Sequence, residues 1–298
     1  MLNIENKKLQ NTLPNIPLLQ GDVVDLTDGD SNRVVAIDQR YIYKQYFSQK
    51  QLRQETAGYL LFNSLTSFGV PMVLDKGNDY LILEFIDAKA CFALHHRQRI
   101  LSKNQIAQKA ALFIAEVYWN YRFFDKNRTR LFIGVAWDER TADILAKSIR
   151  YADQVAKIIQ ADKLPLIRAA QEVVAAVDTD ERSLTLLHRD LHLDNILVKN
   201  DCVGRNSNYV IDFEHCMEGP IELEMQNSIF WNDDWSIPIE AVRDELTKKH
   251  DVPYSLSRER DMLSVYFLDQ LNLAMEKNDE EKAQVLVNLY DQRIQERD

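Results

Sequence analysis

The chain has 298 residues, a length that allows one large domain or two lobes with a cleft between them. Its formal net charge of −10 argues against a nucleic-acid-binding protein, because the phosphate backbone demands a basic surface. Hydrophobic residues make up 46% of the sequence, which is enough for a sizeable core.

The cysteines and the start of the chain indicate a compartment. The three cysteines are Cys91, Cys202 and Cys216, and no two of them have the spacing of metal ligands. So few cysteines fit a reducing environment. The first fifteen residues are polar and no segment is long enough to cross a bilayer. The sequence therefore predicts a cytoplasmic protein with no membrane partner.

A hairpin is predicted near the start of the chain. Two apolar segments, residues 23–26 and 33–37, flank a polar turn at residues 27–32. Backbone N–H groups at such a tip can bind nucleotide phosphates. The turn contains one glycine, so it is not a Gly-x-Gly-x-x-Gly loop, and an ordinary hairpin turn is an equal alternative.

The next predicted strand, residues 40–46, places a lysine on a half-buried face. Alternation puts Lys44 and Tyr46 on the same side of the strand. A charged lysine on a half-buried face needs a nearby anion to balance its charge. In kinases the anion is the α- and β-phosphates, and a glutamate of the following helix steadies the lysine. Helical spacing over residues 49–67 points Glu55 inward, although a surface lysine and a solvated glutamate are the alternative.

The remaining elements are predicted from periodicity and turn residues. Two further strands are expected at 70–74 and 80–86. From Ser102 onward the pattern is mostly helical, and Ser102 with Gln105 forms a capping box. The expected helices cover residues 102–117, 142–159, 166–177, 221–230 and 239–298, the last with one interruption at Val252-Pro253.

The stretch Leu187–Val198 carries the functional hypothesis. Asp190 is followed five positions later by Asn195, and a second acid, Asp212, lies at the end of the apolar strand that begins at Tyr209. In phosphoryl transfer one carboxylate accepts a hydrogen bond from the attacking hydroxyl, while an amide oxygen and a second carboxylate hold Mg²⁺. We therefore predict Asp190 as the catalytic residue, Asn195 and Asp212 as metal ligands, and ATP with Mg²⁺ as cofactors. Two surface acids and an asparagine on loops are the alternative.

These motifs have a family resemblance. His188-Arg189-Asp190-Leu191-His192, followed by Asn195-Ile196-Leu197 and by Ile211-Asp212-Phe213-Glu214, resembles the aminoglycoside phosphotransferase and choline kinase group of protein-kinase-like folds. His192 matches a histidine that this group often has, whereas Arg189 replaces the more common glycine. The resemblance implies an α+β, bilobal fold. An antiparallel-sheet N-lobe would cover residues 1–87 and a mainly helical C-lobe residues 88–298.

The same resemblance assigns nucleotide-binding residues in the first lobe. A phosphate-covering loop, the lysine–glutamate pair and a backbone segment that links the lobes and binds the adenine edge are each expected. These residues are Ser31 and Asn32 in the loop, Lys44 and Glu55 as the pair, and Glu84 to Ile86 in the linking segment. An acid of the helix after Phe213, either Glu222 or Glu224, would anchor that helix to the catalytic loop.

The chain after Phe213 bears on the acceptor. A protein kinase would need a long activation segment ending in an Ala-Pro-Glu-type motif, which does not occur here. We therefore predict transfer to a hydroxyl of a small molecule. Six acids follow the metal site and favour an amine-bearing, aminoglycoside-like acceptor, with solvated helix ends as the alternative. They are Glu214, Glu218, Glu222, Glu224, Asp233 and Asp234.

Other functions stay open at this point. Choline or ethanolamine, a sugar, or a homoserine-type metabolite are alternative acceptors, and a catalytically silent nucleotide-binding scaffold is an alternative of another class. A silent relative is free to lose its catalytic residues. The joint presence of Lys44, Asp190, Asn195 and Asp212 therefore argues against a scaffold.

Overall fold

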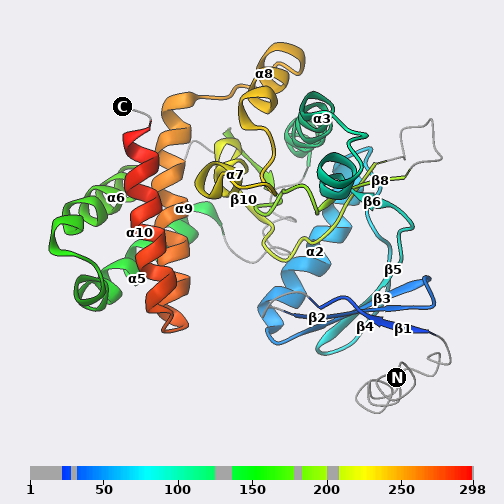
Figure 1. Cartoon of the computed structure of the whole chain (residues 1–298), viewed down its shortest axis with the longest axis horizontal. Helices are drawn as coiled ribbons and strands as arrows, with labels where there is room; N and C mark the ends of the chain where they lie inside the picture. Colours follow the sequence, from blue (N-terminus) through cyan, green and yellow to red (C-terminus); the bar gives the residue numbers. More distant parts are fainter. Residues whose placement is uncertain (1–21, 28–31, 125–135, 178–182, 200–207, 297–298) are drawn as a thin grey trace.

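The computed structural model describes residues 22–27, 32–124, 136–177, 183–199 and 208–296. A twisted sheet with one helix forms the N-terminal part, and helices dominate the rest of the chain (Figure 1). This arrangement confirms the predicted α+β, protein-kinase-like fold with an antiparallel N-terminal sheet and a helical C-terminal part.

The N-terminal sheet has five antiparallel strands in the order β1-β2-β3-β5-β4. Lys44 lies on the central strand β3, where it is paired with Val34 on β2 and Leu81 on β5. The predicted strand at 70–74 begins later than expected, since Pro71 has no N–H to donate to a ladder. The strands are β1 (Val23–Asp25), β2 (Asn32–Ile37), β3 (Tyr41–Tyr46), β4 (Val73–Lys76) and β5 (Tyr80–Glu84).

Helix α2 (Gln49–Leu65) joins this sheet to the body of the protein. Its Phe62 ring stacks on Phe113 and Phe213, with ring centroids 5.6 and 4.6 Å apart. The ring of His188 lies 4.9 Å from that of Phe213. One aromatic cluster therefore holds α2 against both segments that carry the predicted catalytic acids.

Two small sheets support those segments. In one of them β10 pairs with β7, and in the other the order is β6-β8-β9. Asp190 follows β7, and Asn195 immediately precedes β8. The strand predicted to reach Asp212 ends earlier, at Val210. These strands are β6 (Lys89–Ala90), β7 (Leu184–Leu187), β8 (Ile196–Val198), β9 (Asn208–Val210) and β10 (Met217–Pro220).

In the C-terminal part α9 contacts α5, α6, α7 and α10, whereas α3 packs against α8 (Figure 1). The predicted capping box is present at the start of α3. Within the tail, Asn278 adopts a left-handed φ of 54° and Asp279 caps the next helix, so the tail has a second break that was not predicted. The helices are α3 (Lys103–Tyr121), α5 (Trp137–Ile158), α6 (Leu164–Ala176), α7 (Gln226–Trp231), α8 (Ile239–Lys249), α9 (Leu256–Glu276) and α10 (Glu280–Gln295), with short turns η1 (Ala93–Arg97), η2 (Ala161–Lys163) and η5 (Ile221–Leu223).

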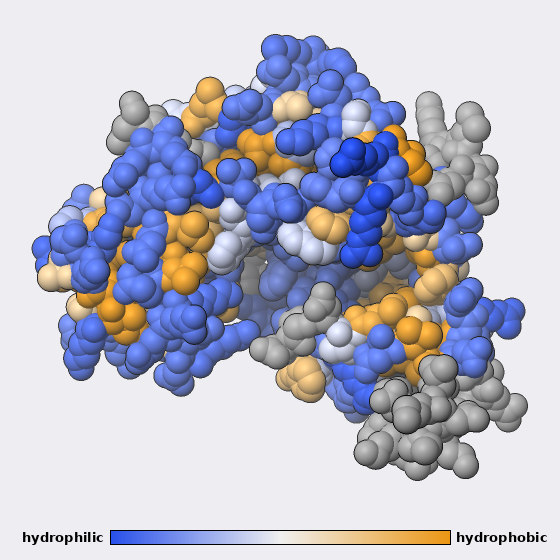
Figure 2. Space-filling model, viewed as in Figure 1, coloured by the Kyte–Doolittle hydropathy of each residue, from blue (hydrophilic) through white to orange (hydrophobic). Residues whose placement is uncertain are grey.

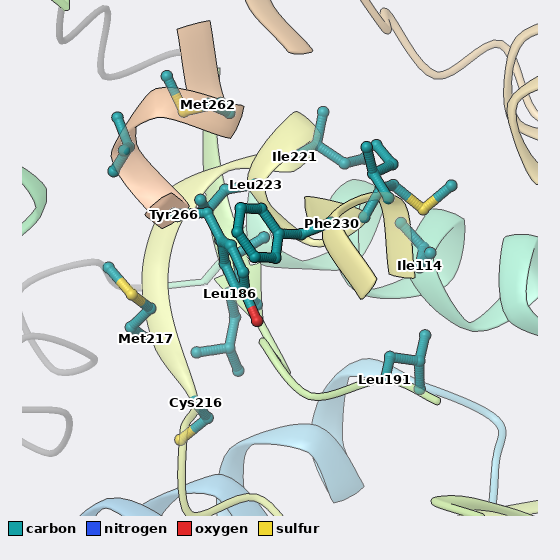
Figure 3. Packing of buried hydrophobic residues seen from close by; sticks show 14 of the residues in the cluster. Ile114, Leu186, Leu191, Cys216, Met217, Ile221, Leu223, Phe230, Met262 and Tyr266 are labelled. Carbon is teal, nitrogen blue, oxygen red and sulfur yellow. The ribbon is translucent and has the colours of Figure 1, made fainter. Parts of the chain in front are cut away.

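The core behind the catalytic loop is apolar and continuous. Figure 3 shows Phe230 of α7 beside Tyr266 of α9, and their ring centroids are 5.4 Å apart. Leu186 of β7 and Leu223 of η5 are buried in the same cluster. No helix in the described part of the chain has both the length and the apolar character of a membrane span.

Gly58 lets α2 approach the segment that follows β9, and Gly58→Ala tests this contact. A Cβ at this position would overlap the Cβ of Phe213. We expect a loss of about 1–3 kcal/mol in the free energy of unfolding from overpacking. This loss outweighs a gain in helix propensity of about 1 kcal/mol. Denaturant unfolding measures the change.

The control for this prediction is Asn63→Ala, at an exposed position of the same helix. It should leave the stability unchanged or raise it slightly. A Gly58→Ala protein as stable as the wild type would contradict the close packing.

Candidate active site

The ammonium group of Lys44 lies at the centre of the site. Its Nζ is 2.7 Å from Oδ1 of Asp212, 2.9 Å from Oε2 of Glu55 and 3.2 Å from Oε2 of Glu214. Glu55 comes from α2, whereas Asp212 and Glu214 follow Lys44 by about 170 residues in the chain. The structure therefore brings the predicted lysine–glutamate pair together with the second predicted acid.

Burial and charge act against each other in this cluster. Burial disfavours the charged amine, but Glu55, Asp212 and Glu214 outweigh it and hold the pKa of Lys44 above its ordinary value. Burial also raises the pKa of Glu55 to about 7, against the opposing effect of Lys44. Tyr46 and Tyr59 donate hydrogen bonds to the two oxygens of Glu55, at 2.5 and 2.9 Å. Both carboxylate oxygens of Glu55 are therefore hydrogen-bonded inside the protein.

Glu214 belongs to the site although the sequence analysis assigned it only to an acidic cluster. Asn32 donates a hydrogen bond from Nδ2 to Oε2 of Glu214, which also faces Lys44. The sequence feature that could have identified Glu214 is its position two residues after Asp212. The side chain of Asn32 is buried and faces this carboxylate, and the role of its loop in covering nucleotide phosphates stays a prediction.

Oxygen donors suited to Mg²⁺ converge here. One carboxylate oxygen from each of Glu55, Asp212 and Glu214 lies within 4.8 Å of the others. Glu55 is fully buried and bonded through both oxygens, whereas 35% of the Asp212 side chain is exposed. Hard divalent cations prefer such carboxylate and amide oxygens. The donor set fits Mg²⁺, with Asp212 and Glu214 better placed to hold it than Glu55.

The catalytic loop is organised by hydrogen bonds of its own. Asn195 donates from Nδ2 to the backbone oxygen of Asp190, at 2.9 Å. Nε2 of His192 lies 3.7 Å from Oδ2 of Asp190 and 3.0 Å from Nδ2 of Asn195. The backbone N–H of Ile211 donates to the oxygen of Asn195, which ties this loop to the segment that carries Asp212.

Asp190 is held in place from the helical side. Asn227 of α7 donates from Nδ2 to Oδ1 of Asp190 at 2.9 Å, and Tyr266 donates its hydroxyl to Oδ1 of Asn227 at 2.8 Å. Trp231 donates in turn to the hydroxyl of Tyr266. Sequence reasoning missed Asn227 and Tyr266, because no local pattern connects them with a carboxylate 37 or more residues earlier.

The pKa of Asp190 indicates an ionised carboxylate. Burial alone would raise the pKa, but the nearby imidazole of His192, together with those of His215 and His188, outweighs burial and lowers the pKa below its ordinary value. An ionised carboxylate can accept a hydrogen bond from a hydroxyl group. The side chain that was predicted to be catalytic therefore has a charge state suited to that task.

Glu224 is the acid that anchors the loop. Its Oε2 accepts a hydrogen bond of 2.7 Å from the backbone N–H of His188, and its Oε1 one of 3.2 Å from that of Arg189. Glu222 instead accepts from the backbone N–H of Ser255, on the other side of the core. The structure thus decides between the two candidates that the sequence left open.

The predicted nucleotide-binding backbone lies where β5 leaves the sheet. The N–H of Glu84 donates to the oxygen of Met72, and that of Phe85 donates to the oxygen of Arg40. Among the described residues no hydrogen bond involves the N–H of Ile86, so this donor is available to a ligand. Ser31, the other predicted loop residue, lies outside the described residues.

Most of the acidic cluster does not face solvent. Glu218, Glu222 and Glu224 are 1–3% exposed, and Tyr121 donates a hydrogen bond to Glu218. Asp233 and Asp234 are exposed beyond α7. Because the three glutamates bind interior groups, the argument from this cluster for an amine-bearing acceptor loses its main support.

The titration of Glu224 yields a testable pH dependence. Burial raises its pKa to about 7, although the backbone N–H groups of His188 and Arg189 oppose the shift. From about pH 4.5 to 7 the native state then binds more protons than the unfolded state, so this group makes the free energy of unfolding fall as the pH rises. A shift of this size is equivalent to about 3 kcal/mol. In Glu224→Gln we expect the decline over that interval to be smaller.

Denaturant unfolding at several pH values measures this decline. Glu280→Gln, at an exposed position of α10, should show the wild-type pH dependence. An unchanged slope in Glu224→Gln would contradict the assignment.

Comparisons with known proteins agree with this geometry. A family model described as "Phosphotransferase enzyme family" matches residues 22–247. The solved gentamicin complex of APH(2")-IIa is 18% identical, with a TM-score of 0.70 over 98% of this chain and 97% of that chain. Aminoglycoside phosphotransferase APH(4)-Ia is 16% identical, with a TM-score of 0.68 over 99% of each chain. ADP-bound APH(2'')-Ib is 17% identical, with a TM-score of 0.66 over 97% of this chain and 99% of that chain.

At such identities the solved structures establish the shared fold alone. No curated protein matches the chain by sequence. The family model, however, covers well over half of the chain and includes the Lys44 cluster and the catalytic loop. The resemblance inferred from the motifs is therefore confirmed, and the chain belongs to the phosphotransferase enzyme family.

Proposed function

We propose that this protein transfers the γ-phosphoryl group of ATP to a hydroxyl group of a small molecule. The observation that carries the proposal is the contact of Lys44 on β3 with Asp212, at 2.7 Å, beside the loop that holds Asp190 and Asn195. Groups for phosphate binding, metal binding and hydroxyl orientation meet at this one place.

Asp190 orients the attacking hydroxyl and accepts its hydrogen bond. Oδ1 accepts a hydrogen bond of 2.9 Å from Asn227, whereas Oδ2 accepts only a longer one, of 3.5 Å, from Nδ2 of Asn195. Oδ2 is therefore the oxygen that we assign to the acceptor. Such a reaction depends mainly on positioning and on neutralisation of charge. The rigid support of Asp190 by α7 and α9 serves the positioning.

Lys44 binds the phosphates, and Glu55 holds the lysine in place. Asn195, Asp212 and Glu214 would hold Mg²⁺, which neutralises phosphate charge when bound. The amide nitrogen of Asn195 is used within the loop, which leaves its oxygen for the metal. The N–H of Ile86 would bind the adenine edge, and the division into lobes at residue 87 stays a prediction.

Relatives of the same fold support a nucleotide as the donor, and some of them were solved with GDP, so the choice of ATP over GTP is part of the proposal. APH(2'')-Ib was solved with ADP, and APH(2")-IIa with streptomycin and ATP in one complex. A catalytically silent scaffold is the alternative from another class. Nothing in the described site favours it, since each group needed for transfer is present and connected.

Asp190→Asn tests the catalytic role. The amide oxygen can still accept from Asn227, so the variant removes the charge and leaves this contact. We expect turnover to fall by about 10²–10⁴-fold. Binding of Mg-ATP, measured by thermal shift, should remain.

Asp212→Asn tests the metal ligand. Both metal-dependent binding, measured by thermal shift, and turnover, measured by ADP release with a panel of alcohols, should be lost.

Asp244→Asn is the control, because this acid is exposed on α8 and pairs only with Lys248 in the described structure. Its binding of Mg-ATP and its turnover should equal those of the wild type. Full turnover in Asp190→Asn would contradict the assigned role. A wild-type protein that binds Mg-ATP but phosphorylates none of the alcohols would favour the scaffold.

A further inference from the structure

A cleft of about 720 Å³ opens beside Asp190 and Glu214. Its walls come from the start of α2, from α5, from α9 and from the turn that leads to α10. Figure 2 shows the hollow between the two parts of the protein, in which the visible residues are hydrophilic. A molecule bound in this cleft would reach the carboxylate of Asp190. Asp190 also lines a smaller pocket of about 230 Å³ together with His192 and Asp233, but the larger cleft has more room for an acceptor.

The wall of this cleft away from the reaction centre is rich in cations. Apart from Asp190 and Glu214, the described lining residues include six basic side chains and three carboxylates. The carboxylates are Asp269, Glu276 and Asp279. The basic residues are Lys50, Arg140, Lys147, Arg189, Lys277 and Lys282.

Two of the arginines share a single carboxylate. Nη2 of Arg140 lies 2.6 Å from Oδ1 of Asp269, and Nη2 of Arg189 lies 3.2 Å from Oδ2. Burial opposes ionisation of Asp269, but the two guanidinium groups outweigh it and lower its pKa. Arg189 is 9% exposed, and its Nε has no hydrogen-bond partner among the described residues. Nη1 of Arg140 also lies 4.0 Å from Oδ2 of Asp143, so both arginines are paired with carboxylates.

Lys50 adds a cation that has no ion-pair partner in the described structure. It lies in the first turn of α2, opposite Arg140 and Lys147 across the cleft. Lys50 is an exposed residue. Desolvation by its surroundings and the charges of Arg140 and Lys147 lower its pKa, against the opposing effect of Asp143 and Asp269. Lys147 itself is paired with Asp143 and Glu276, at 3.0 and 2.9 Å. An anion between these residues would relieve the repulsion on Lys50.

The start of α2 adds hydrogen-bond donors to the same wall. Its N-cap residue, Ser48, lines the cleft and makes no side-chain capping bond, and the first turn contains no acid. The first N–H groups of a helix are donors without helical partners, and the helix dipole favours an anion there. Lys50 therefore extends a site that the backbone already makes positive.

We propose that the acceptor is an alcohol that carries an anionic group, a phosphate or a carboxylate, held between the start of α2 and the cationic side chains of α5. This inference rests on the proposed phosphotransferase function and names its substrate class. The anionic group binds Lys50 and the cations opposite, while the hydroxyl of the same molecule reaches Asp190. A polyamine acceptor would instead meet the positive wall and be repelled.

Binding of an anion tests the site without any turnover. The full chain is saturated with Mg²⁺ and a non-hydrolysable ATP analogue, so that the nucleotide site is filled. Inorganic phosphate is then titrated at constant ionic strength, with spermidine as the cationic counterpart. We expect phosphate to bind and Lys50→Gln to weaken it by about tenfold, the effect of one nearby charge.

The matched control is Lys248→Gln, which removes the same charge from an exposed position on α8. It should bind phosphate as the wild type does. Equal phosphate affinity in Lys50→Gln and the wild type, or tighter binding of spermidine than of phosphate, would overturn the inference. Failure to bind the ATP analogue would instead overturn the proposed function.

The same inference predicts an order of acceptors. In matched sets such as glucose, glucose 6-phosphate, gluconate and glucosamine, the anionic member should have the highest kcat/KM in ADP release, with the product identified by mass spectrometry. Lys50→Gln should raise KM for the anionic acceptor more than it lowers kcat. A preference for glucosamine or kanamycin would contradict an anionic acceptor while leaving phosphotransfer intact.

Discussion

The ion cluster around Lys44 joins the two parts of the protein. One buried ammonium group is shared by Glu55 of α2 and by Asp212 and Glu214 of the helical part. Removing one partner from a buried ion pair costs far more than an exposed pair contributes, since the remaining charge stays desolvated. The position of the sheet relative to the catalytic loop therefore depends on this contact. Three carboxylates against one cation also leave an excess of negative charge, which a divalent cation would neutralise.

The three carboxylates are not equivalent. Glu55 has both oxygens bonded by interior groups, and Glu214 is shared with Asn32. Asp212 is the most exposed of the three, and its backbone has a left-handed φ of 66°. Such a conformation is unusual outside glycine, although aspartate tolerates it better than most residues. It ends the strand pairing at Val210, so that Asp212 lies at the start of a turn rather than within the ladder.

Local chemistry was predictable from the sequence, and long-range support was not. Asp190 and Asn195 lie on one loop because five residues separate them, and alternation along β3 correctly turned Lys44 inward. Asn227, Tyr266 and Asp269 escaped prediction, because their contacts with Asp190 and Arg189 depend on how α7 and α9 pack. The acids at 218, 222 and 224 formed a cluster in the sequence, yet each faces a different interior partner. A group of like charges along the chain therefore did not indicate a charged surface.

The cleft proposed for the acceptor is lined only in part by the residues proposed to support the transfer step. The Lys44 cluster, the catalytic loop and the cations of α2 and α5 lie within the region matched by the family model, whereas α9 and the turn after it lie outside residues 22–247. A fold shared at 14–18% identity with aminoglycoside kinases does not by itself assign a substrate to this cleft. The net charge of −10 is no guide to that wall either, since a low-dielectric cleft focuses the field of its own lining residues. Here those residues include Lys50 at an uncapped helix start and two arginines on one aspartate, and the proposal of an anionic acceptor in an acidic protein rests on them.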